Sequence, residues 1–284
     1  MRALVIGANG QVGRALLATA PAGAEVIAAD RAALDITDDA SVRAFVTRTR
    51  PDVIFNAAAY TAVDRAEHEE DQARAINATA VASLRDAAAA VGARLVHLST
   101  DFVFDGTAAE PYPANAKLAP MSAYGRSKRA GEHAAGPDAL IVRTAWVYGE
   151  GANFVATMLK LMRSRDEIRV VDDQVGTPTW ATSLAEALWR LALDGAAGVH
   201  HFTDSGEASW YDFAVAIQEE ALAAGLLDRA IPVIPISTAD YPTAAARPAY
   251  SVLDKRETFA LLGSSAPHWR VNLRQMLKQQ ANHG

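Results

Sequence analysis

The sequence has no cysteine among its 284 residues and no long apolar run. The absence of cysteine excludes disulfide bonds, iron–sulfur clusters, a cysteine nucleophile and a cysteine-ligated zinc site. Basic runs are also missing, and 27 basic against 33 acidic side chains give a net charge of −6, which argues against a nucleic-acid partner. With no stretch typical of a signal peptide or a membrane span, we expect a cytoplasmic protein with no membrane partner.

The composition and length of the sequence are typical of a well-packed globular protein. Half of the residues are hydrophobic and 21% are charged, which is ordinary for a globular protein. A chain of this length buries roughly 75% of its unfolded surface, so its core needs no metal or disulfide for stability. The length is typical of one large domain, or of a core domain with a smaller lobe.

Short apolar runs alternate with alanine-rich segments through the first half of the chain. The apolar runs predict strands at 3–6, 25–29, 52–56, 94–99 and 139–143. The segments between them predict helices near 11–19, 39–50, 67–91 and 127–135. The acidic residues of 67–71 suit the solvated first turn of the third helix. This alternation indicates right-handed crossovers and a parallel sheet covered on both sides, so we expect a doubly wound, Rossmann-type α/β fold.

Three glycines follow the first predicted strand, in the segment GANGQVG at 7–13. Glycines at a strand-to-helix turn let the backbone approach a pyrophosphate, and the helix N-terminus adds amide donors. The spacing is G-x-x-G-x-x-G, and three glycines alone are also typical of an ordinary sharp turn. However, Asp30 ends the second strand 20 residues after Gly10, where a carboxylate binds the adenine ribose of a dinucleotide. The loop therefore predicts dinucleotide binding through Gly7, Gly10, Gln11, Val12 and Gly13.

The residues after the second strand leave open whether the dinucleotide carries a 2′-phosphate. Asp30 favours an unphosphorylated ribose because a carboxylate repels phosphate, whereas Arg31 beside it pairs with phosphate. Asp35 and Ile36 follow a further short loop and are candidates to flank the adenine, although Asp35 also suits a surface turn. We therefore expect either NADPH or NADH as the cofactor.

A second chemical signal is Tyr124-Gly-Arg-Ser-Lys128, in which a tyrosine and a lysine are four residues apart. On a helix this spacing places both on one face, and an ammonium group near a phenol lowers the phenol's pKa from about 10. By itself the pair is more typical of two surface neighbours. Ser99-Thr100-Asp101 strengthens the functional interpretation, because it stands where the fourth strand ends, at the edge where such sheets bind ligands. A hydroxyl there can hydrogen-bond a carbonyl oxygen while Tyr124 protonates it.

Together, the glycine loop, the strand-four hydroxyl and the Tyr-x-x-x-Lys pair resemble the extended short-chain dehydrogenase/reductase family. Within that family, the sequence more closely resembles the dTDP-4-dehydrorhamnose reductase branch. The stretches that carry this are NAAAYTAVDRAE (56–67), STDFVFDG (99–106), YGRSKRAGE (124–132), RTAWVYG (143–149), DDQVGTPT (172–179) and ARPAYSVL (246–253). The resemblance spans most of the chain. It implies NAD(P)H-dependent reduction of the C4 ketone of dTDP-4-dehydro-6-deoxy-L-hexulose, the last step of dTDP-L-rhamnose synthesis.

The resemblance also implies roles for single residues. Tyr124 is implied as the acid that protonates the ketone oxygen, Lys128 as a ligand of the nicotinamide ribose, and Thr100 as a hydrogen-bond donor to the same oxygen. The other implied contacts are Ala59, Tyr60 and Thr61 beside the cofactor and Asp101, Trp146 and Arg247 at the substrate. Arg247 is implied to lie near the diphosphate of a nucleotide-sugar substrate. Without the family, Trp146 is typical of a core residue and Arg247 of a solvated one.

The second half of the sequence alternates less regularly. We expect helices near 154–163, 182–193 and 210–224, and an extended segment at 168–171. We therefore expect residues 1–144 to form the dinucleotide-binding domain, with roughly 174–200 packing back onto it. Residues 145–284 are expected to form mainly a smaller, discontinuous α/β substrate-binding lobe.

One position departs from the family's pattern. Some members form dimers through a metal ion held by glutamates, one of them two residues after the last loop glycine. That position is Ala15 here, so we expect no metal at this site, and a monomer or a weak homodimer. His200 and His201 lie in a short apolar segment without metal-ligand spacing, and we expect them to be structural.

Two other kinds of function share these motifs. One is a nucleotide-sugar 4-epimerase, 4,6-dehydratase or other 4-ketoreductase. Dehydratases of the family carry Thr-Asp-Glu, and the Phe102 that follows Thr100-Asp101 here argues against dehydration. The other is a non-catalytic regulatory subunit resembling the beta subunit of methionine adenosyltransferase, whose sheet binds a dinucleotide while its surface docks a partner. The joint presence of Thr100, Tyr124 and Lys128 favours an enzyme.

Overall fold

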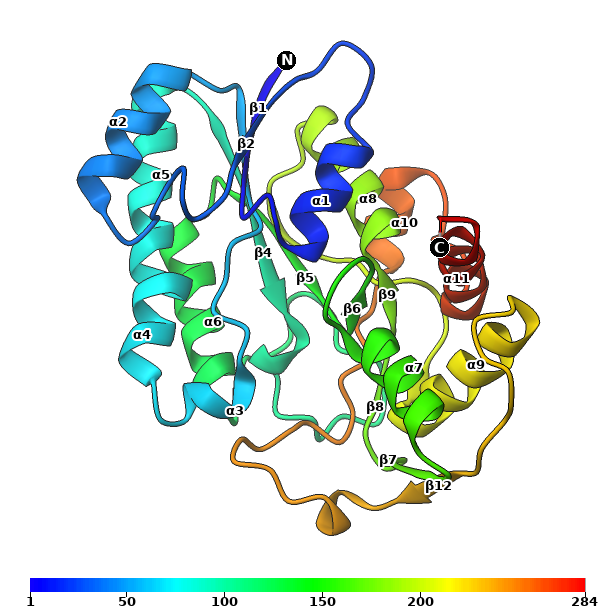
Figure 1. Ribbon diagram of the computed structural model, residues 1–284. Coiled ribbons are helices and arrows are strands. Elements are labelled where there is room, and N and C mark those ends of the chain that lie inside the picture. The colour runs from blue at the N-terminus through cyan, green and yellow to red at the C-terminus, as the bar shows by residue number, and fades with distance from the viewer. Residues whose placement is uncertain (284) are drawn as a thin grey trace.

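The computed structural model describes residues 1–283, and a six-stranded parallel sheet forms its centre (Figure 1). The strand order is β10-β5-β4-β3-β1-β2. The strands are β1 (Arg2–Ile6), β2 (Glu25–Ala29), β3 (Val53–Asn56), β4 (Arg94–Thr100), β5 (Leu140–Thr144) and β10 (Gly198–His201). Ile6 pairs with both Ala29 and Asn56, and Thr100 pairs with Thr144. The register therefore brings the residues that follow these strands to one edge of the sheet.

Helices cover both faces of this sheet, as expected for a doubly wound fold (Figure 1). One face packs against α1 (Gln11–Ala18), α8 (Ala181–Leu193) and α10 (Arg256–Leu262), and the other against α2 (Asp39–Thr49), α5 (Ala80–Val91) and α6 (Ala123–Ala135). Alternate residues of β1 enter the two cores: Ala3 and Val5 pack on the α8 side, Leu4 and Ile6 on the α2 and α5 side. This two-sided burial explains why the strand is apolar throughout.

A smaller lobe lies beside the sheet at the lower right of Figure 1. It contains the helices α7 (Phe154–Ser164), α9 (Trp210–Ala223) and α11 (Trp269–His283) and the parallel pair β7 (Ile168–Val171) and β12 (Val233–Ile236). Two short pairs lie between the lobe and the sheet: β6 (Val147–Tyr148) with β9 (Thr179–Trp180), and β8 (Val175–Gly176) with β11 (Ala208–Ser209). Buried aromatic residues, including Tyr148, Phe213 and Trp269, fill the core of this lobe.

The chain passes between the two parts more than once. After β9 it returns to the sheet as α8 and β10, enters the lobe again as α9 and β12, and comes back as α10 before α11 ends it. Trp189 of α8 illustrates the return, because its indole donates to the Leu16 carbonyl of α1 at 3.0 Å. The smaller lobe is therefore assembled from several separate segments.

The predicted helix at 67–91 begins at Glu70 in the structure and contains a π-helical turn. α4 (Glu70–Arg74), the π-helical turn (Ala75–Thr79) and α5 follow one another without a break, and a separate short helix, α3 (Val63–Ala66), precedes them. Glu70 and Asp71 form an exposed first turn of α4, as predicted, and Glu70 pairs with Arg126. Glu67 instead lies before this helix and accepts from the backbone N–H of Ala123 at 2.8 Å. These long-range bonds join the segment to α6, and the local sequence pattern contained no sign of them.

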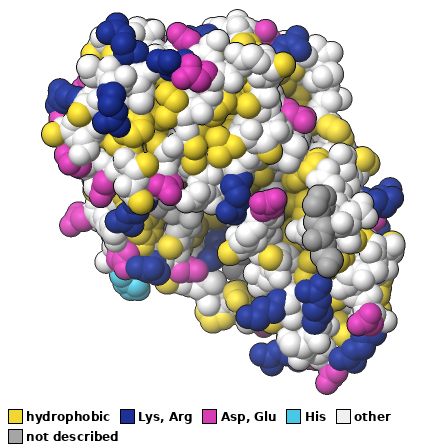
Figure 2. All heavy atoms as spheres, turned by 45° about the horizontal axis from the view of Figure 1, so that its top comes forward, with side chains coloured by type: hydrophobic (Ala, Val, Ile, Leu, Met, Phe, Trp, Pro, Cys, Tyr) yellow, Lys and Arg dark blue, Asp and Glu magenta, His cyan; other side chains and the backbone are white. Residues whose placement is uncertain are grey.

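Two surface properties bear on partners. Within residues 1–283, no helix combines the length and the apolar character needed to cross a membrane. Basic and acidic side chains are interspersed over the face seen in Figure 2, in agreement with the absence of a basic run in the sequence. Ala15, the position at which the family resemblance implied a metal ligand, is a buried residue of α1 and packs in the core that contains α8.

Candidate active site

Two adjoining cavities lie at the edge of the sheet where the strands end. The central cavity, of about 670 Å³, lies between the sheet and the smaller lobe, and the outer cavity, of about 400 Å³, lies beyond β2. Gly10, Ala57 and Ala59 line both, so the two are continuous. The predicted residues at the outer cavity are Gly7, Gly10, Asp30, Arg31, Asp35, Ile36 and Ala59. Those at the central cavity are Gly10, Gln11, Val12, Ala59, Thr61, Thr100, Asp101, Tyr124, Lys128, Trp146 and Arg247.

The glycine loop is packed too tightly for side chains. Gly7 has a φ of +77°, and a Cβ there would lie 2.7 Å from the backbone nitrogen of Ala58. A Cβ on Gly13 would lie 2.2 Å from the Gly7 carbonyl oxygen, so this glycine lets α1 start directly against its own loop. Gly10 precedes the first turn of α1 and provides no side-chain cap for it. The loop therefore leaves the N-terminus of α1 without a side-chain cap and facing both cavities. Such a helix N-terminus can bind a pyrophosphate.

Asp30 is held in place by its own turn. Its Oδ1 accepts from the backbone N–H groups of Ala32 and Ala33 at 3.0 and 2.9 Å, and its Oδ2 accepts from Asn9 Nδ2 at 2.8 Å. The carboxylate therefore also shapes the loop that forms the wall of the outer cavity, a role that its position in the sequence did not reveal.

Two predicted cofactor contacts are not among the lining residues of either cavity. Gly13 acts through packing, as described above. The hydroxyl of Tyr60 donates to Glu69 at 2.5 Å, and its backbone N–H donates to Asn77 Oδ1 at 2.8 Å. Asn77, which the sequence analysis missed, also donates to Ser127 of α6 at 2.9 Å. It lies in the π-helical turn and thus ties the loop after β3 to the helix that carries Tyr124 and Lys128.

Tyr124 and Thr100 meet because α6 starts against the end of β4. Ser122 caps α6 by accepting from the N–H of Gly125 at 3.1 Å. A Cβ on Gly125 would lie 2.3 Å from the Phe102 carbonyl oxygen, so the helix rests directly on the turn after Thr100. The rings of Tyr124 and Phe102 pack edge to face, with centroids 5.7 Å apart.

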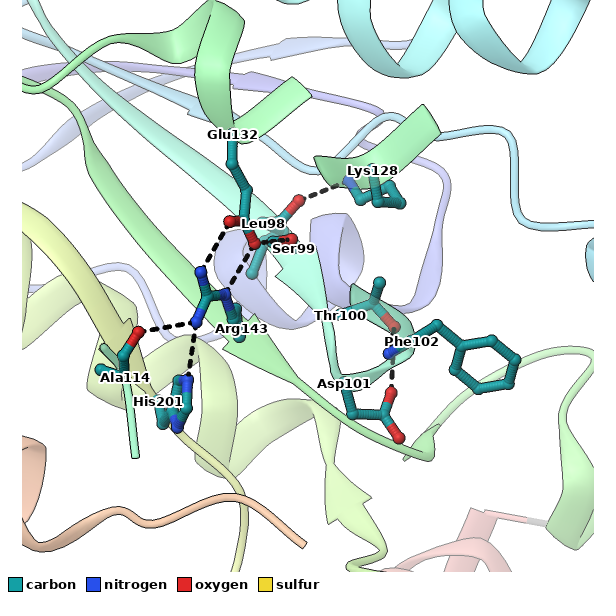
Figure 3. Close-up of polar contacts among 10 residues, drawn as sticks. All are labelled: Leu98, Ser99, Thr100, Asp101, Phe102, Ala114, Lys128, Glu132, Arg143 and His201. Atoms are coloured by element: carbon teal, nitrogen blue, oxygen red, sulfur yellow. Dashed lines mark hydrogen bonds and ion pairs between the residues drawn. The ribbon is translucent and has the colours of Figure 1, made fainter. Parts of the chain in front are cut away.

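Burial controls the ionisation of these groups. It raises the pKa of Tyr124 to about 12, with hydrogen bonding with Thr100 opposing the rise and the Asp101 charge adding to it. Burial lowers the pKa of Lys128 to about 8, while Glu132 opposes this change. The expected fall in the phenol's pKa is therefore wrong for this structure, because loss of solvent is the largest influence on it and the one acting charge, Asp101, is negative. The Lys128 ammonium instead donates to the Leu98 carbonyl at 2.5 Å (Figure 3).

Asp101 is a carboxyl group buried at the floor of the central cavity. It is 2% exposed and accepts from the Thr100 hydroxyl at 2.9 Å (Figure 3). Burial raises its pKa from 3.8 to about 6, although hydrogen bonds with Ser251 and Thr100 oppose the rise. Keeping the Asp101 carboxyl ionised at neutral pH therefore lowers the stability of the folded protein.

The wall on the side of the smaller lobe is aromatic. Trp146 stacks on Trp210 of α9, with centroids 3.5 Å apart and planes at 8°. Its φ of +47° is rare for a residue with a side chain, and Gly176 leaves the space that the indole occupies. Arg247 forms two bonds with Asp64 of α3, at 3.1 and 2.8 Å, and so links the loop after β12 to the segment after β3. The sequence analysis identified neither Trp210 nor Asp64.

The sequence matches the family described as RmlD substrate binding domain over residues 1–282. The chain belongs to this family. Among its relatives, the dTDP-4-dehydrorhamnose reductase of Escherichia coli strain K12 is 42% identical, over 98% of each chain. A dTDP-4-keto-6-deoxy-D-glucose reductase of Streptomyces niveus is 48% identical over 75% of this chain and 76% of that protein. A Bacillus anthracis dTDP-4-dehydrorhamnose reductase solved in complex with NADP has a TM-score of 0.91 at 37% identity, over 98% of this chain and 99% of that chain. The family resemblance and the fold expected from the motifs are confirmed.

Proposed function

We propose that the protein reduces the C4 ketone of dTDP-4-dehydro-6-deoxy-L-hexulose to dTDP-L-rhamnose with NADPH or NADH. The observation that carries this proposal is the meeting of Thr100, Tyr124 and Lys128 in one cavity that is continuous with the glycine loop. A hydroxyl, a phenol and an ammonium group around one point are the groups that carbonyl reduction needs. The names of the Escherichia coli and Bacillus anthracis relatives support this substrate.

The two cavities fit a dinucleotide. Together they line a path from Asp30 and Ile36 past the glycine loop to Tyr124 and Lys128. The Oε1 atom of Gln11 at this loop is buried and has no hydrogen-bond partner within the protein, so it is available to a bound ligand. The proposed contacts are Asp30, Arg31, Asp35 and Ile36 at the adenosine, Gly7 to Gly13 at the pyrophosphate, and Ala59, Thr61 and Lys128 at the nicotinamide ribose. When bound, the reduced nicotinamide supplies the hydride that the ketone carbon accepts.

The chain's own residues then supply the proton and stabilise the oxygen. Tyr124 is protonated at neutral pH because burial raises its pKa to about 12, so its O–H is available to the ketone oxygen. We propose that the Thr100 hydroxyl, which donates to Asp101 here, turns to the same oxygen and stabilises its developing charge. The ammonium of Lys128 favours the phenolate that remains until solvent returns a proton.

The rest of the substrate fits the wall formed by the smaller lobe. We propose that the sugar packs on Trp146 and that Arg247 binds the diphosphate. A third cavity of about 500 Å³ shares Trp210 and Arg247 with the central cavity. Apolar residues such as Phe154 and Met158 line it together with polar and charged ones such as Arg165 and Gln174. A pocket with aromatic, aliphatic and polar groups beside the proposed phosphate-binding arginine suits the nucleoside.

Several finer statements are part of the same proposal. Residues 1–144, with roughly 174–200, would bind the dinucleotide, and 145–284 mainly the nucleotide sugar. We expect a cytoplasmic monomer or weak homodimer without a metal at Ala15. The Streptomyces niveus relative favours one second candidate, reduction of a different dTDP-4-keto-6-deoxyhexose by the same groups.

The test follows absorbance at 340 nm with the purified protein and NADH or NADPH in parallel. The keto sugar is generated from dTDP-glucose by a dehydratase and an epimerase. Substrate-dependent loss of reduced cofactor, with dTDP-rhamnose as product, is the expected result. Turnover only after omission of the epimerase would favour the second candidate. Dinucleotide binding without turnover of either sugar would contradict the reductase and favour a regulatory subunit.

A further inference from the structure

A buried ion pair lies directly behind the site (Figure 3). Glu132 of α6 and Arg143 of β5 form two bonds of 2.7 Å each, and their side chains are only 6% and 3% exposed. The remaining Arg143 nitrogen, Nη1, donates to the Ala114 carbonyl at 2.9 Å and lies 3.3 Å from Nε2 of His201. Neither Glu132 nor Arg143 lines the central cavity, so neither is a catalytic residue.

Glu132 also binds the strand that carries Thr100. The Ser99 hydroxyl donates to Glu132 Oε1 at 2.5 Å, and Ser99 directly precedes Thr100 in β4. One residue earlier, the Leu98 carbonyl accepts from Lys128 at 2.5 Å. Side chains from two successive turns of α6 therefore hold two successive residues of β4, immediately before the residue that faces Tyr124.

An ion pair is a costly means of joining a helix to a sheet. Removing two charges from water offsets most of their attraction, and apolar residues of the same volume often give equal or greater stability. A bidentate carboxylate–guanidinium pair does supply direction, because its geometry fixes both distance and angle. Lys128 and Tyr124 lie one and two turns before Glu132 on α6. A fixed Glu132 therefore determines where both of them project.

Resting on the reductase function proposed above, we infer that Glu132 is a positioning residue of the reaction. Held by Arg143 and holding Ser99, it sets α6 against the end of β4 so that Tyr124 and Lys128 face Thr100 across the central cavity.

Glu132 also acts on Lys128 through its charge. Its carboxylate opposes the lowering of the Lys128 pKa by burial. The other groups near the amine are Tyr124 on α6, which is uncharged at neutral pH, and His97 on β4, whose pKa burial and the Lys128 charge lower well below its usual value. Arg143 on β5 lies behind Glu132, and the Asp101 carboxyl lines the same cavity as Lys128. Glu132 is the charge that opposes the lowering of the Lys128 pKa by burial, so loss of its carboxylate lowers the pKa of the amine further.

The experiment compares Glu132→Gln with a matched variant, Glu220→Gln. Glu220 of α9 is also 6% exposed and binds two arginines, Arg270 and Arg274 of α11, but it lines neither cavity of the site. Each protein is assayed for kcat and KM across pH, for thermal unfolding, and for the titration of Lys128 by NMR of ¹³Cε-labelled lysine. The chain has only five lysines, so a Lys128→Arg protein identifies the signal.

We expect Glu132→Gln to lower kcat roughly tenfold or more, because small misplacements of reacting groups are costly. Its Lys128 titration and the basic limb of its kcat profile should both move to lower pH. Glu220→Gln should lose thermal stability with kcat and the Lys128 titration unchanged. A folded Glu132→Gln with unaltered kcat and titration would overturn the inference, as would an equal loss of kcat in Glu220→Gln.

Two further variants serve if Glu132→Gln fails to fold with Arg143 left unpaired. Ser99→Ala removes only the bond to the strand, and should lower kcat without moving the Lys128 titration. Glu132→Gln with Arg143→Met removes both charges, and should fold with kcat lowered and the titration shifted. Normal kcat in both would refute the inference. If the unaltered protein does not reduce the keto sugar, the proposed function fails, while the Lys128 titration still tests the effect of Glu132.

Discussion

Replacing Asp101 by asparagine is expected to make the protein more stable and less active. The folded protein raises the pKa of this carboxyl from 3.8 to about 6. Between these two pH values the folded state keeps a proton that the unfolded state releases, so the stability contributed by Asp101 falls as pH rises through this window and stays low above it. The difference of roughly two pKa units corresponds to about 3 kcal/mol.

The magnitude is measured as a difference between two pH values. Urea unfolding followed by tryptophan fluorescence gives the free energy of unfolding of the unaltered protein and of Asp101→Asn at pH 4 and pH 7.5. Effects of the substitution that do not depend on pH, such as altered hydrogen bonding to Thr100, cancel in this comparison. We expect the asparagine variant to gain up to about 3 kcal/mol relative to the unaltered protein between the lower and the higher pH.

Asp204 supplies the control. Burial also raises its pKa to about 6, but it lines neither cavity of the site. Asp204→Asn should show a similar pH-dependent gain in stability with turnover unchanged, whereas Asp101→Asn should lose turnover because its carboxylate contacts Thr100. A stability difference for Asp101→Asn that is the same at both pH values would refute the reasoning.

The remaining predictions concern the proton donor and the cofactor. Tyr124→Phe should lower kcat by roughly 10²–10⁴-fold with NADPH affinity retained, and unaltered turnover would exclude Tyr124 as the acid. Asp30→Asn keeps an oxygen to accept from Ala32 and Ala33, so it isolates the charge; calorimetry should show weaker NADH binding with NADPH less affected. Equal losses of affinity for NADH and NADPH would mean that the Asp30 carboxylate does not distinguish the two riboses. Gly13→Ala should abolish dinucleotide binding, because its Cβ would lie 2.2 Å from the Gly7 carbonyl oxygen. Normal affinity would contradict the proposal that this loop binds the pyrophosphate.

Local sequence was enough to place most elements of the sheet. The predicted strand at 25–29 coincides with β2, and that at 52–56 differs from β3 (Val53–Asn56) by one residue. Parallel strands buried on both faces are continuous apolar runs, and such runs are visible without knowledge of the partner strand. β10 was missed because its four residues contain two histidines, and only its pairing with β5 makes it a strand.

The residues of the candidate site likewise fall into those that the sequence predicted and those that it missed. Glycines, a Tyr-x-x-x-Lys pair and hydroxyls at strand ends can be recognised by residue type and spacing. Gly7, Thr100, Tyr124 and Lys128 were therefore predicted from the sequence alone, and the structure places them at the two adjoining cavities. Trp210, Asn77 and Asp64 were not, because each matters only through a neighbour distant in sequence: Trp146, Tyr60 and Arg247 respectively. No local pattern encodes those pairings.

The sequence by itself determined the fold class, and it predicted the dinucleotide loop and the reacting groups, because these depend on short-range periodicity and on side-chain chemistry. Only the tertiary structure decided their ionisation. The helical spacing of Tyr124 and Lys128 predicted a lowered phenol pKa, but burial raises it to about 12 and lowers that of the amine to about 8. Burial and the buried charges of Glu132 and Arg143 arise from β4, β5 and α6 packing together, and the free energy of a charge depends on everything that replaces water around it.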